Sequence, residues 1–306
     1  MPPKLAILLK TYIHKHIKWI LLICLVLIWG SSFILMKRTL DFYSNNALGA
    51  LRISFAGIVL LPFAFSRLKQ LNKKQWFYLV IVGLIGNTFP AFLFAKAQTV
   101  IDSSLAGILN STTPLFTLLV GISLYKLKAH WLNYVGILFG FAGAILIILA
   151  KNGGQIDFNI QYSLYVILAS IFYAFNLNVI KYNLSDTDPY TIAIVSYSIV
   201  VGPILVYLFT GTDFMQSLQY PGAVKALIYP ALLGVFGSAI AIIIFNNLIK
   251  ISGVLFAASV TYIIPIVASL IGFADGEIFK PIYLVWISLI LIGVYFVNID
   301  PKSKKE

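Results

Sequence analysis

A run of polar residues stands directly before a proline in the middle of a long uncharged stretch. Residues 103–125 contain no charged side chain, yet Asn110 and the three hydroxyl residues after it precede Pro114. Proline has no backbone N–H, so the carbonyl of Asn110, four residues earlier, loses its helical hydrogen-bond donor. A free carbonyl beside amide and hydroxyl groups can hold a polar solute. The pattern therefore predicts a helix that is broken at a binding site.

The same arrangement returns 151 residues later. Pro265 follows Thr261 and Tyr262 in another uncharged stretch, and Pro265 leaves the carbonyl of Thr261 free. With the same offset, small and aromatic residues match in pairs, which are Gly83–Gly234, Gly86–Gly237, Phe94–Phe245, Ala106–Ala257 and Pro114–Pro265. We infer an internal repeat with one broken helix in each copy.

Further polar and aromatic side chains fall near the middle of apolar stretches. An amide without a partner is costly in hydrocarbon, so Asn110 and Asn176 are expected to face a cavity, each other or the backbone. Trp29 and Tyr173 are either cavity lining or core packing, and small residues such as Ser32 also suit close helix packing. We expect a solute to contact Trp29, Ser32, Asn110, Tyr173, Asn176, Thr261 and Tyr262, with helix breaks at Pro114 and Pro265.

Arg52 is the one charged residue inside a predicted membrane span. It stands about seven residues from the start of an apolar stretch that begins near Asn45. A structural role would have it extend to the outer interface or pair with Asp41 or Asp102. A functional role would have it meet an anionic group in an outer vestibule. Both interpretations stay open at this stage.

Titratable groups that could carry catalysis or protons are missing from the apolar stretches. The three histidines lie in the N-terminal arm and in a loop, and the single cysteine, Cys24, cannot form an intrachain disulfide or a metal cluster. A membrane hydrolase or metalloprotease would need paired acids, clustered histidines or a nucleophile with a base. We therefore expect no enzyme, no metal, no cofactor and no proton-carrying carboxylate within the membrane. All ten acids lie outside the predicted spans: Asp41, Asp102, Asp157, Asp186, Asp188, Asp213, Asp275, Glu277, Asp300 and Glu306.

The elements that must position these residues are membrane helices. Of the 306 residues, 60% are hydrophobic and 10% are charged, with a mean hydropathy of +0.95, which leaves too little polar surface for a soluble fold of this size. The net charge of +12 would favour nucleic acid in a soluble protein, but here it lies between apolar runs, and we expect no nucleic-acid partner. Ten apolar stretches are long enough to cross a bilayer as helices: 19–36, 45–65, 76–95, 103–125, 131–150, 162–180, 190–210, 226–248, 253–274 and 281–297.

Positive charges predict the orientation, because lysine and arginine concentrate in cytoplasmic loops. With a cytoplasmic N-terminus, fifteen lysines and arginines fall on the inner face and six on the outer face. Five helices per repeat is an odd number, so the second copy must be inverted relative to the first. We expect an arm at 1–18, a first repeat at 19–150, a second at 162–298 and a tail at 299–306, with arm and tail both cytoplasmic.

The chain resembles the ten-helix drug/metabolite transporter superfamily, and within it the EamA branch. The resemblance rests on residues 27–33 (LIWGSSF), Lys37, Arg52, the two proline-centred helices, Gly136, Gly140 and Gly143, and, in the second copy, Tyr173-Ala174, Lys181 and Gly276-Glu277. It implies export or exchange of amino acids, related metabolites or drugs across the inner membrane. One departure is Tyr125-Lys126, where this family often has Gly-Glu.

From the residues and the resemblance we expect a transporter that moves neutral or zwitterionic solutes by alternating access, with amino acids as the leading class. The alternatives are a channel, a membrane scaffold without transport, or a membrane enzyme. The expected partners are a small-molecule substrate and the lipid bilayer. The sequence sets no oligomeric state and is compatible with a monomer.

Overall fold

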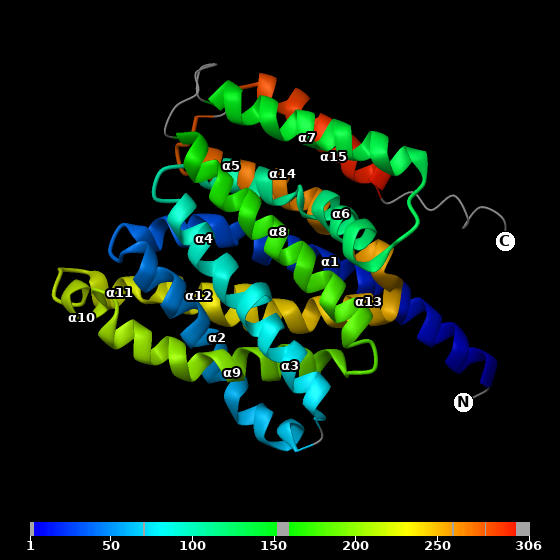
Figure 1. Cartoon of the computed structure of the whole chain (residues 1–306), viewed down its shortest axis with the longest axis horizontal. Helices are drawn as coiled ribbons and strands as arrows, with labels where there is room; N and C mark the ends of the chain where they lie inside the picture. The colour runs from blue at the N-terminus through cyan, green and yellow to red at the C-terminus, as the bar shows by residue number, and fades with distance from the viewer. Residues whose placement is uncertain (1–2, 70, 152–158, 259, 279, 298–306) are drawn as a thin grey trace.

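The computed structural model describes residues 3–69, 71–151, 159–258, 260–278 and 280–297, and within these ranges every regular element is a helix (Figure 1). The helices are α1 (Pro3–Leu40), α2 (Asn45–Leu68), α3 (Lys73–Ile81), η1 (Val82–Thr88), α4 (Phe89–Ala97), α5 (Ser103–Asn110), α6 (Thr113–Tyr125), α7 (Trp131–Lys151), α8 (Asn159–Asn183), α9 (Pro189–Thr210), α10 (Phe214–Ser217), α11 (Ala223–Ala226), α12 (Ile228–Gly234), η2 (Val235–Ile240), α13 (Ala241–Ala258), α14 (Val260–Ala274) and α15 (Ile282–Val297).

The helices account for the predicted membrane crossings. In the described part of the chain, eight helical segments are long and apolar enough to cross a bilayer, and two shorter apolar helices, Ile263–Ala274 and Ile282–Val297, follow them. Segments of this length satisfy their own backbone hydrogen bonds in lipid only as helices. The all-α membrane fold is therefore confirmed. From Pro3 onward the expected N-terminal arm is helical and continues directly into the first crossing as α1.

Helix packing relates the two halves of the chain. Helix α1 packs against α13 and α14, and its counterpart α8 packs against α4, α5 and α6. Helix α2 packs against α9, and α7 against α15, so each of these pairs joins one helix from each half. Helix α1 begins and α15 ends at the same end of the bundle (Figure 1). The two five-helix repeats thus form one interlocked bundle rather than two separate domains.

The pair α7–α15 forms an outer layer of the bundle (Figure 1). Its helices approach so closely that a Cβ added to Gly136 would lie 2.5 Å from the carbonyl oxygen of Gly293. Large apolar side chains on the same helices, such as Leu138, Ile145 and Leu284, are exposed. Without a hydrophobic driving force between helices in lipid, small residues at such a crossing permit close van der Waals packing.

The two proline-centred helices differ. The first is interrupted at Ser111–Thr112, between α5 and α6, and Pro114 lies in the first turn of α6. The second is not interrupted, since α14 continues through Pro265, and the helix break predicted there is wrong. Hydroxyls that bond nearby carbonyls compete with helical backbone bonds, and the residues just before Pro265 include no serine or threonine later than Thr261.

The connection expected between the eighth and ninth spans also differs from the prediction. Helix α13 continues to Ala258, past the link expected near residues 249–252, and α14 begins at Val260. The gap between apolar stretches at residues 249–252 therefore does not mark the end of α13.

Two π-helical segments occupy corresponding places in the repeats. Segment η1 precedes α4 in the first repeat and η2 precedes α13 in the second, and they contain the repeat pair Gly86 and Gly237. In η1 the hydroxyl of Thr88 donates to the carbonyl of Gly83 at 2.9 Å, which satisfies a carbonyl within the wider turn. Such π-segments are frequent at functional sites. Residues of both segments line the cavity described below.

Candidate substrate cavity

A central cavity of about 190 Å³ lies where the two repeats meet. Residues from both repeats line it, and they come from the helices of all spans except α7 and α15. Among them are six of the residues predicted from the sequence: Trp29, Ser32, Asn110, Tyr173, Asn176 and Thr261. The side chain of Tyr262 lies outside the described residues, and neither Pro114 nor Pro265 lines the cavity.

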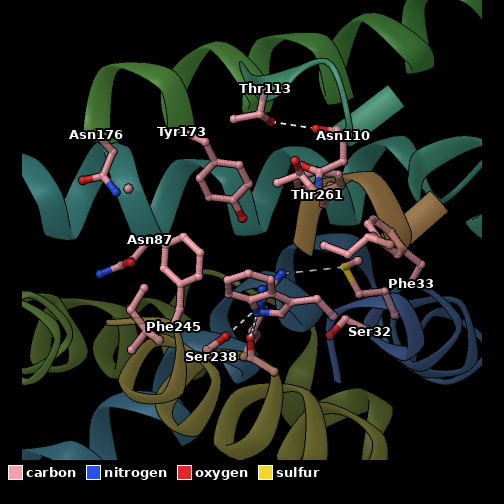
Figure 2. A pocket seen from close by; sticks show the side chains of 18 of the residues that line it. Ser32, Phe33, Asn87, Asn110, Thr113, Tyr173, Asn176, Ser238, Phe245 and Thr261 are labelled. Carbon is pink, nitrogen blue, oxygen red and sulfur yellow. Dashed lines mark hydrogen bonds between the residues drawn. The ribbon is translucent and has the colours of Figure 1, made fainter. Parts of the chain in front are cut away.

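One wall is built on Gly237 of η2. The indole Nε1–H of Trp29 donates to the carbonyl oxygen of Gly237 at 3.1 Å, and the Trp29 ring packs on Phe245 with a centroid separation of 5.3 Å. A Cβ added to Gly237 would lie 2.9 Å from the Ser32 hydroxyl oxygen. Figure 2 shows Ser32, Ser238 and Phe245 on this side of the cavity. The tryptophan is thus held in place by a bond across the repeat boundary.

The facing wall repeats this arrangement with other residues. Asn176 lies against Gly86 of η1, and a Cβ there would lie 2.4 Å from the amide carbon of Asn176. Tyr173, which lies in α8 with Asn176, points into the cavity (Figure 2), and its ring packs on Phe94 with a centroid separation of 6.0 Å. The Oδ1 of Asn176 is buried and has no hydrogen-bond partner within the described structure. This amide oxygen is available to a bound solute.

The broken helix α5–α6 presents Asn110 to the same cavity. The carbonyl oxygen that Pro114 leaves without a helical donor accepts a hydrogen bond from the Thr113 hydroxyl at 2.7 Å, so it is not free as predicted. Likewise, Ser111 donates to the carbonyl of Ile108 and Thr112 to that of Leu109. The Asn110 side chain is different, because its Oδ1 is buried with no partner among the described residues. At this break the side-chain amide, not the backbone, offers the open acceptor.

Arg52 lies in the central cavity and not in an outer vestibule. Its Nε–H donates to the Ser238 hydroxyl at 3.0 Å, and its guanidinium lies beside the phenols of Tyr173 and Tyr197. Asp41, one of the partners considered for it, instead pairs with Arg38. In the described part of the chain, no ion pair involves Arg52. The prediction of an outer position is therefore wrong, because α2 packs against η2 and Arg52 bonds Ser238 of η2.

Sequence reasoning missed several lining residues. Asn87 and Ser238 directly follow the repeat glycines Gly86 and Gly237, so the repeat register could have identified them. Tyr197 of α9 and Met36 of α1 carried no such signal. The remaining lining residues are Phe33, Gly86, Phe94, Thr113, Leu177, Gly237, Ile242, Phe245 and Ile264.

The family follows from sequence comparison. The model of the EamA-like transporter family matches this chain twice, over residues 17–149 and 161–299. The chain belongs to the EamA-like transporter family. It is accordingly an integral membrane transporter and not an enzyme, and the resemblance seen in the sequence is confirmed.

Individual relatives agree with this assignment. The chain is 26% identical over 284 residues to the uncharacterized inner membrane transporter YedA of Escherichia coli, covering 91% of this chain and 89% of YedA. It is 24% identical to the chloroplastic WAT1-related protein At3g02690 of Arabidopsis thaliana, covering 92% of this chain and 69% of that protein. A solved crystal structure superposes with a TM-score of 0.62 at 16% identity, covering 94% of this chain and 98% of the other, and supports the fold alone.

Proposed function

We propose that this transporter carries small solutes that bear a carboxylate, with zwitterionic amino acids as the leading class, by alternating access around the central cavity. The observation that carries the proposal is Arg52, a cation at the cavity wall with no acidic partner in the described structure. A guanidinium at membrane depth is costly without an anion or strong acceptors, and the acceptors of Arg52 are neutral, the Ser238 hydroxyl at 3.0 Å and the Met36 sulfur at 3.9 Å. A carboxylate is the planar acceptor that matches a guanidinium with two parallel hydrogen bonds.

Two acceptors complete the polar lining. The amide oxygens of Asn110 and Asn176 are buried without partners, and both lie across the cavity from Ser238, the partner of Arg52 (Figure 2). A protonated amine donates up to three hydrogen bonds and suits such oxygens. A solute with a carboxylate and an ammonium group therefore matches both sides, which favours an amino acid over a purely apolar drug.

The cavity is large enough for one small solute. About 190 Å³ is several times the roughly 30 Å³ that one water occupies in the liquid. Trp29, Phe33, Phe94 and Phe245 add apolar and aromatic lining that suits an uncharged side chain. This combination of a few polar groups in an apolar pocket is typical of small-molecule sites.

Energy coupling follows from the same lining. None of the described residues that line the cavity is an aspartate, glutamate or histidine. A proton-driven carrier needs a group that exchanges protons near neutral pH and that each side reaches in turn. We therefore propose a facilitator or an exchanger, which exports a solute down its gradient or swaps it for another.

The location and orientation complete the proposal. We propose that the protein lies in the inner (plasma) membrane with both termini cytoplasmic. We also propose that one chain encloses its own cavity and that the repeats comprise residues 19–150 and 162–298. The support is the excess of positive charge on the cytoplasmic face and the similarity to YedA, an inner membrane transporter. Under this orientation, the end of the bundle that contains Glu277 faces outward.

The test is counterflow in proteoliposomes. Vesicles are loaded with single amino acids, and uptake of the same labelled amino acid from outside is followed over time. Stimulation by internal substrate is expected of a carrier and is absent for a channel. Flux without saturation or stimulation, or no flux of any carboxylate-bearing solute, would overturn the proposal.

A further inference from the structure

A second hollow lies on the outer side of the central cavity. It measures about 330 Å³ and is lined by Lys37, Leu40, Asp41, Tyr43, Ser44, Asn45, Gln98 and Thr99. Lys37 directly follows Met36, which lines the central cavity, and Gln98 lies one helical turn after Phe94, which also lines it. The two spaces are therefore separated by about one layer of side chains. We name this second space the outer vestibule.

The separating layer is closed and well packed. Phe33, Met36 and Phe94 are each buried, and the rings of Phe33 and Phe94 meet edge to face with centroids 5.8 Å apart. The Gln98 side-chain amide donates to the carbonyl oxygen of Phe33 at 2.9 Å, which joins the end of α4 to α1. A solute in the central cavity must displace this layer, formed by Phe33, Met36, Phe94 and Gln98, to reach the outer vestibule.

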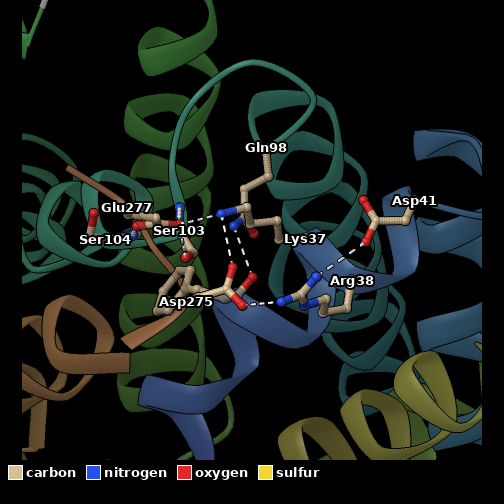
Figure 3. Close-up of polar contacts among 9 residues, drawn as sticks. Lys37, Arg38, Asp41, Gln98, Ser103, Ser104, Asp275 and Glu277 are labelled. Atoms are coloured by element: carbon tan, nitrogen blue, oxygen red, sulfur yellow. Dashed lines mark hydrogen bonds and ion pairs between the residues drawn. The ribbon is translucent and has the colours of Figure 1, made fainter. Parts of the chain in front are cut away.

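Glu277 ties the second repeat to the first beside this layer. It is 7% exposed, and its carboxylate accepts hydrogen bonds from the backbone N–H groups of Ser103 and Ser104 at 2.9 and 3.0 Å (Figure 3). The Ser103 hydroxyl also donates to it, and the ammonium of Lys37 lies 3.1 Å away. One carboxylate therefore joins the first turn of α5 and the last turn of α1 to the loop after α14.

Asp275 adds a second connection in the same loop. Its carboxylate pairs with Lys37 at 3.1 Å and with Arg38, so two consecutive cations of α1 bind the α14–α15 loop. Asp41 extends the network only at its exposed rim, through Arg38 at 3.8 Å. Helices α5 and α14, which carry these contacts, are also close to each other, since a Cβ on Gly107 of α5 would lie 2.5 Å from the Cβ of Ala268 in α14.

We propose that Lys37, Glu277 and Asp275, with the α5 residues Ser103 and Ser104, form the latch of an outer gate, and that substrate passes between cavity and outer vestibule only when this latch separates. Its bonds cross the repeat boundary, which is the boundary that alternating access must open. Hydrogen bonds of this kind, from backbone and charged groups, stabilise the closed arrangement of the two repeats relative to the open one, as a gate requires.

The opposite end of the bundle lacks the same chemistry. At the offset of 151 Lys126 corresponds to Glu277, and the family resemblance matches Lys181 to Lys37 at a shorter offset (181 − 37 = 144), so two cations replace an anion and a cation. Tyr125 and Tyr182 stack there with ring centroids 4.4 Å apart, and Lys181 lies over the ring of Tyr182. The charges of the latch thus have no counterpart at these repeat positions, and the ion pair at that end is a different one, between Arg67 and Asp188 at 2.8 Å. In this structure the contacts of the outer latch are formed.

Cysteine accessibility tests this gate. In a Cys24→Ser background, Asn87→Cys places a reporter on the cavity lining, and a membrane-impermeant maleimide is added to the outside of sealed, right-side-out vesicles. Labelling is expected to be slow in the parent and roughly tenfold faster in Glu277→Gln and in Lys37→Met, since each removes charged hydrogen bonds that hold the gate closed. Asp41→Asn is the matched control, because it removes an acid at the same end whose ion pair is with Arg38 at 3.8 Å and not with any of the five latch residues.

Unchanged labelling in folded variants would overturn the proposal. Folding is followed by the thermal unfolding midpoint in detergent and by membrane abundance. If Glu277→Gln does not reach the membrane, Lys37→Met and Asp275→Asn carry the same test. A labelling rate within twofold of the parent in these variants, or equal acceleration by Asp41→Asn, shows that the latch does not control outer access.

Discussion

Glu277 allows a quantitative prediction from its surroundings. Burial raises the pKa of this carboxyl, but hydrogen bonds from Ser103 and Ser104 together outweigh burial and lower the pKa from an ordinary 4.5 to about 2. A difference of this size corresponds to roughly 3 kcal/mol in favour of the folded state while the carboxylate is ionised. Because the folded pKa is the lower one, this stabilisation is complete above about pH 4.5 and is lost as the pH falls toward 2.

The assay compares the protein with Glu277→Gln across pH. At pH 7 the variant is expected to unfold at a lower temperature in detergent, because the amide cannot replace the charge. Between pH 7 and pH 3 the parent is expected to lose about 2 kcal/mol from this group alone, whereas the variant loses nothing from it. The difference between the two should therefore shrink as the pH falls. A difference that stays constant from pH 7 to pH 3 would refute the assignment of the lowered pKa to Glu277.

Two further predictions concern packing around the cavity and between α7 and α15. Gly86→Ala is expected to displace the Asn176 amide and to raise the half-saturating substrate concentration in transport assays severalfold, with normal membrane abundance; unchanged kinetics would contradict the contact at this glycine. Gly136→Leu is expected to separate α7 from α15 and to lower the unfolding temperature without changing the affinity for substrate. A loss of substrate affinity in the second variant, at equal abundance, would show that this pair belongs to the site.

The sequence was informative about helices because lipid restricts the available structures. Ten apolar stretches predicted the crossings, and the matched pairs Gly86–Gly237 and Phe94–Phe245 placed residues of both repeats on one cavity. The length of an apolar stretch and identities at a fixed spacing of 151 residues can both be read from the chain itself, so no contact information was needed. Tyr262 and the use of the site by a substrate stay predictions.

Side-chain partners could not be predicted in the same way. The capping of the Asn110 carbonyl by Thr113 and the continuous helix through Pro265 depend on which hydroxyls compete for backbone bonds. The inward position of Arg52 depends on the packing of α2 against η2. The sequence marked Gly276-Glu277 as part of the family resemblance but gave Glu277 no partner, because its donors Ser103 and Ser104 lie more than 170 positions away in the chain.

The central claim is that Arg52 recognises a carboxylate, and competition in counterflow tests it most directly. Once a carried amino acid is found, its amide derivative, which lacks the carboxylate, is compared with the parent compound as a competitor, in the protein and in Arg52→Gln. Arg67→Gln, whose arginine pairs with Asp188 away from the cavity, is the control. We predict that the unmodified protein prefers the carboxylate by roughly 10- to 100-fold, consistent with hydrogen bonds to a charged group, and that Arg52→Gln loses this preference. An equal preference in both proteins would contradict the account.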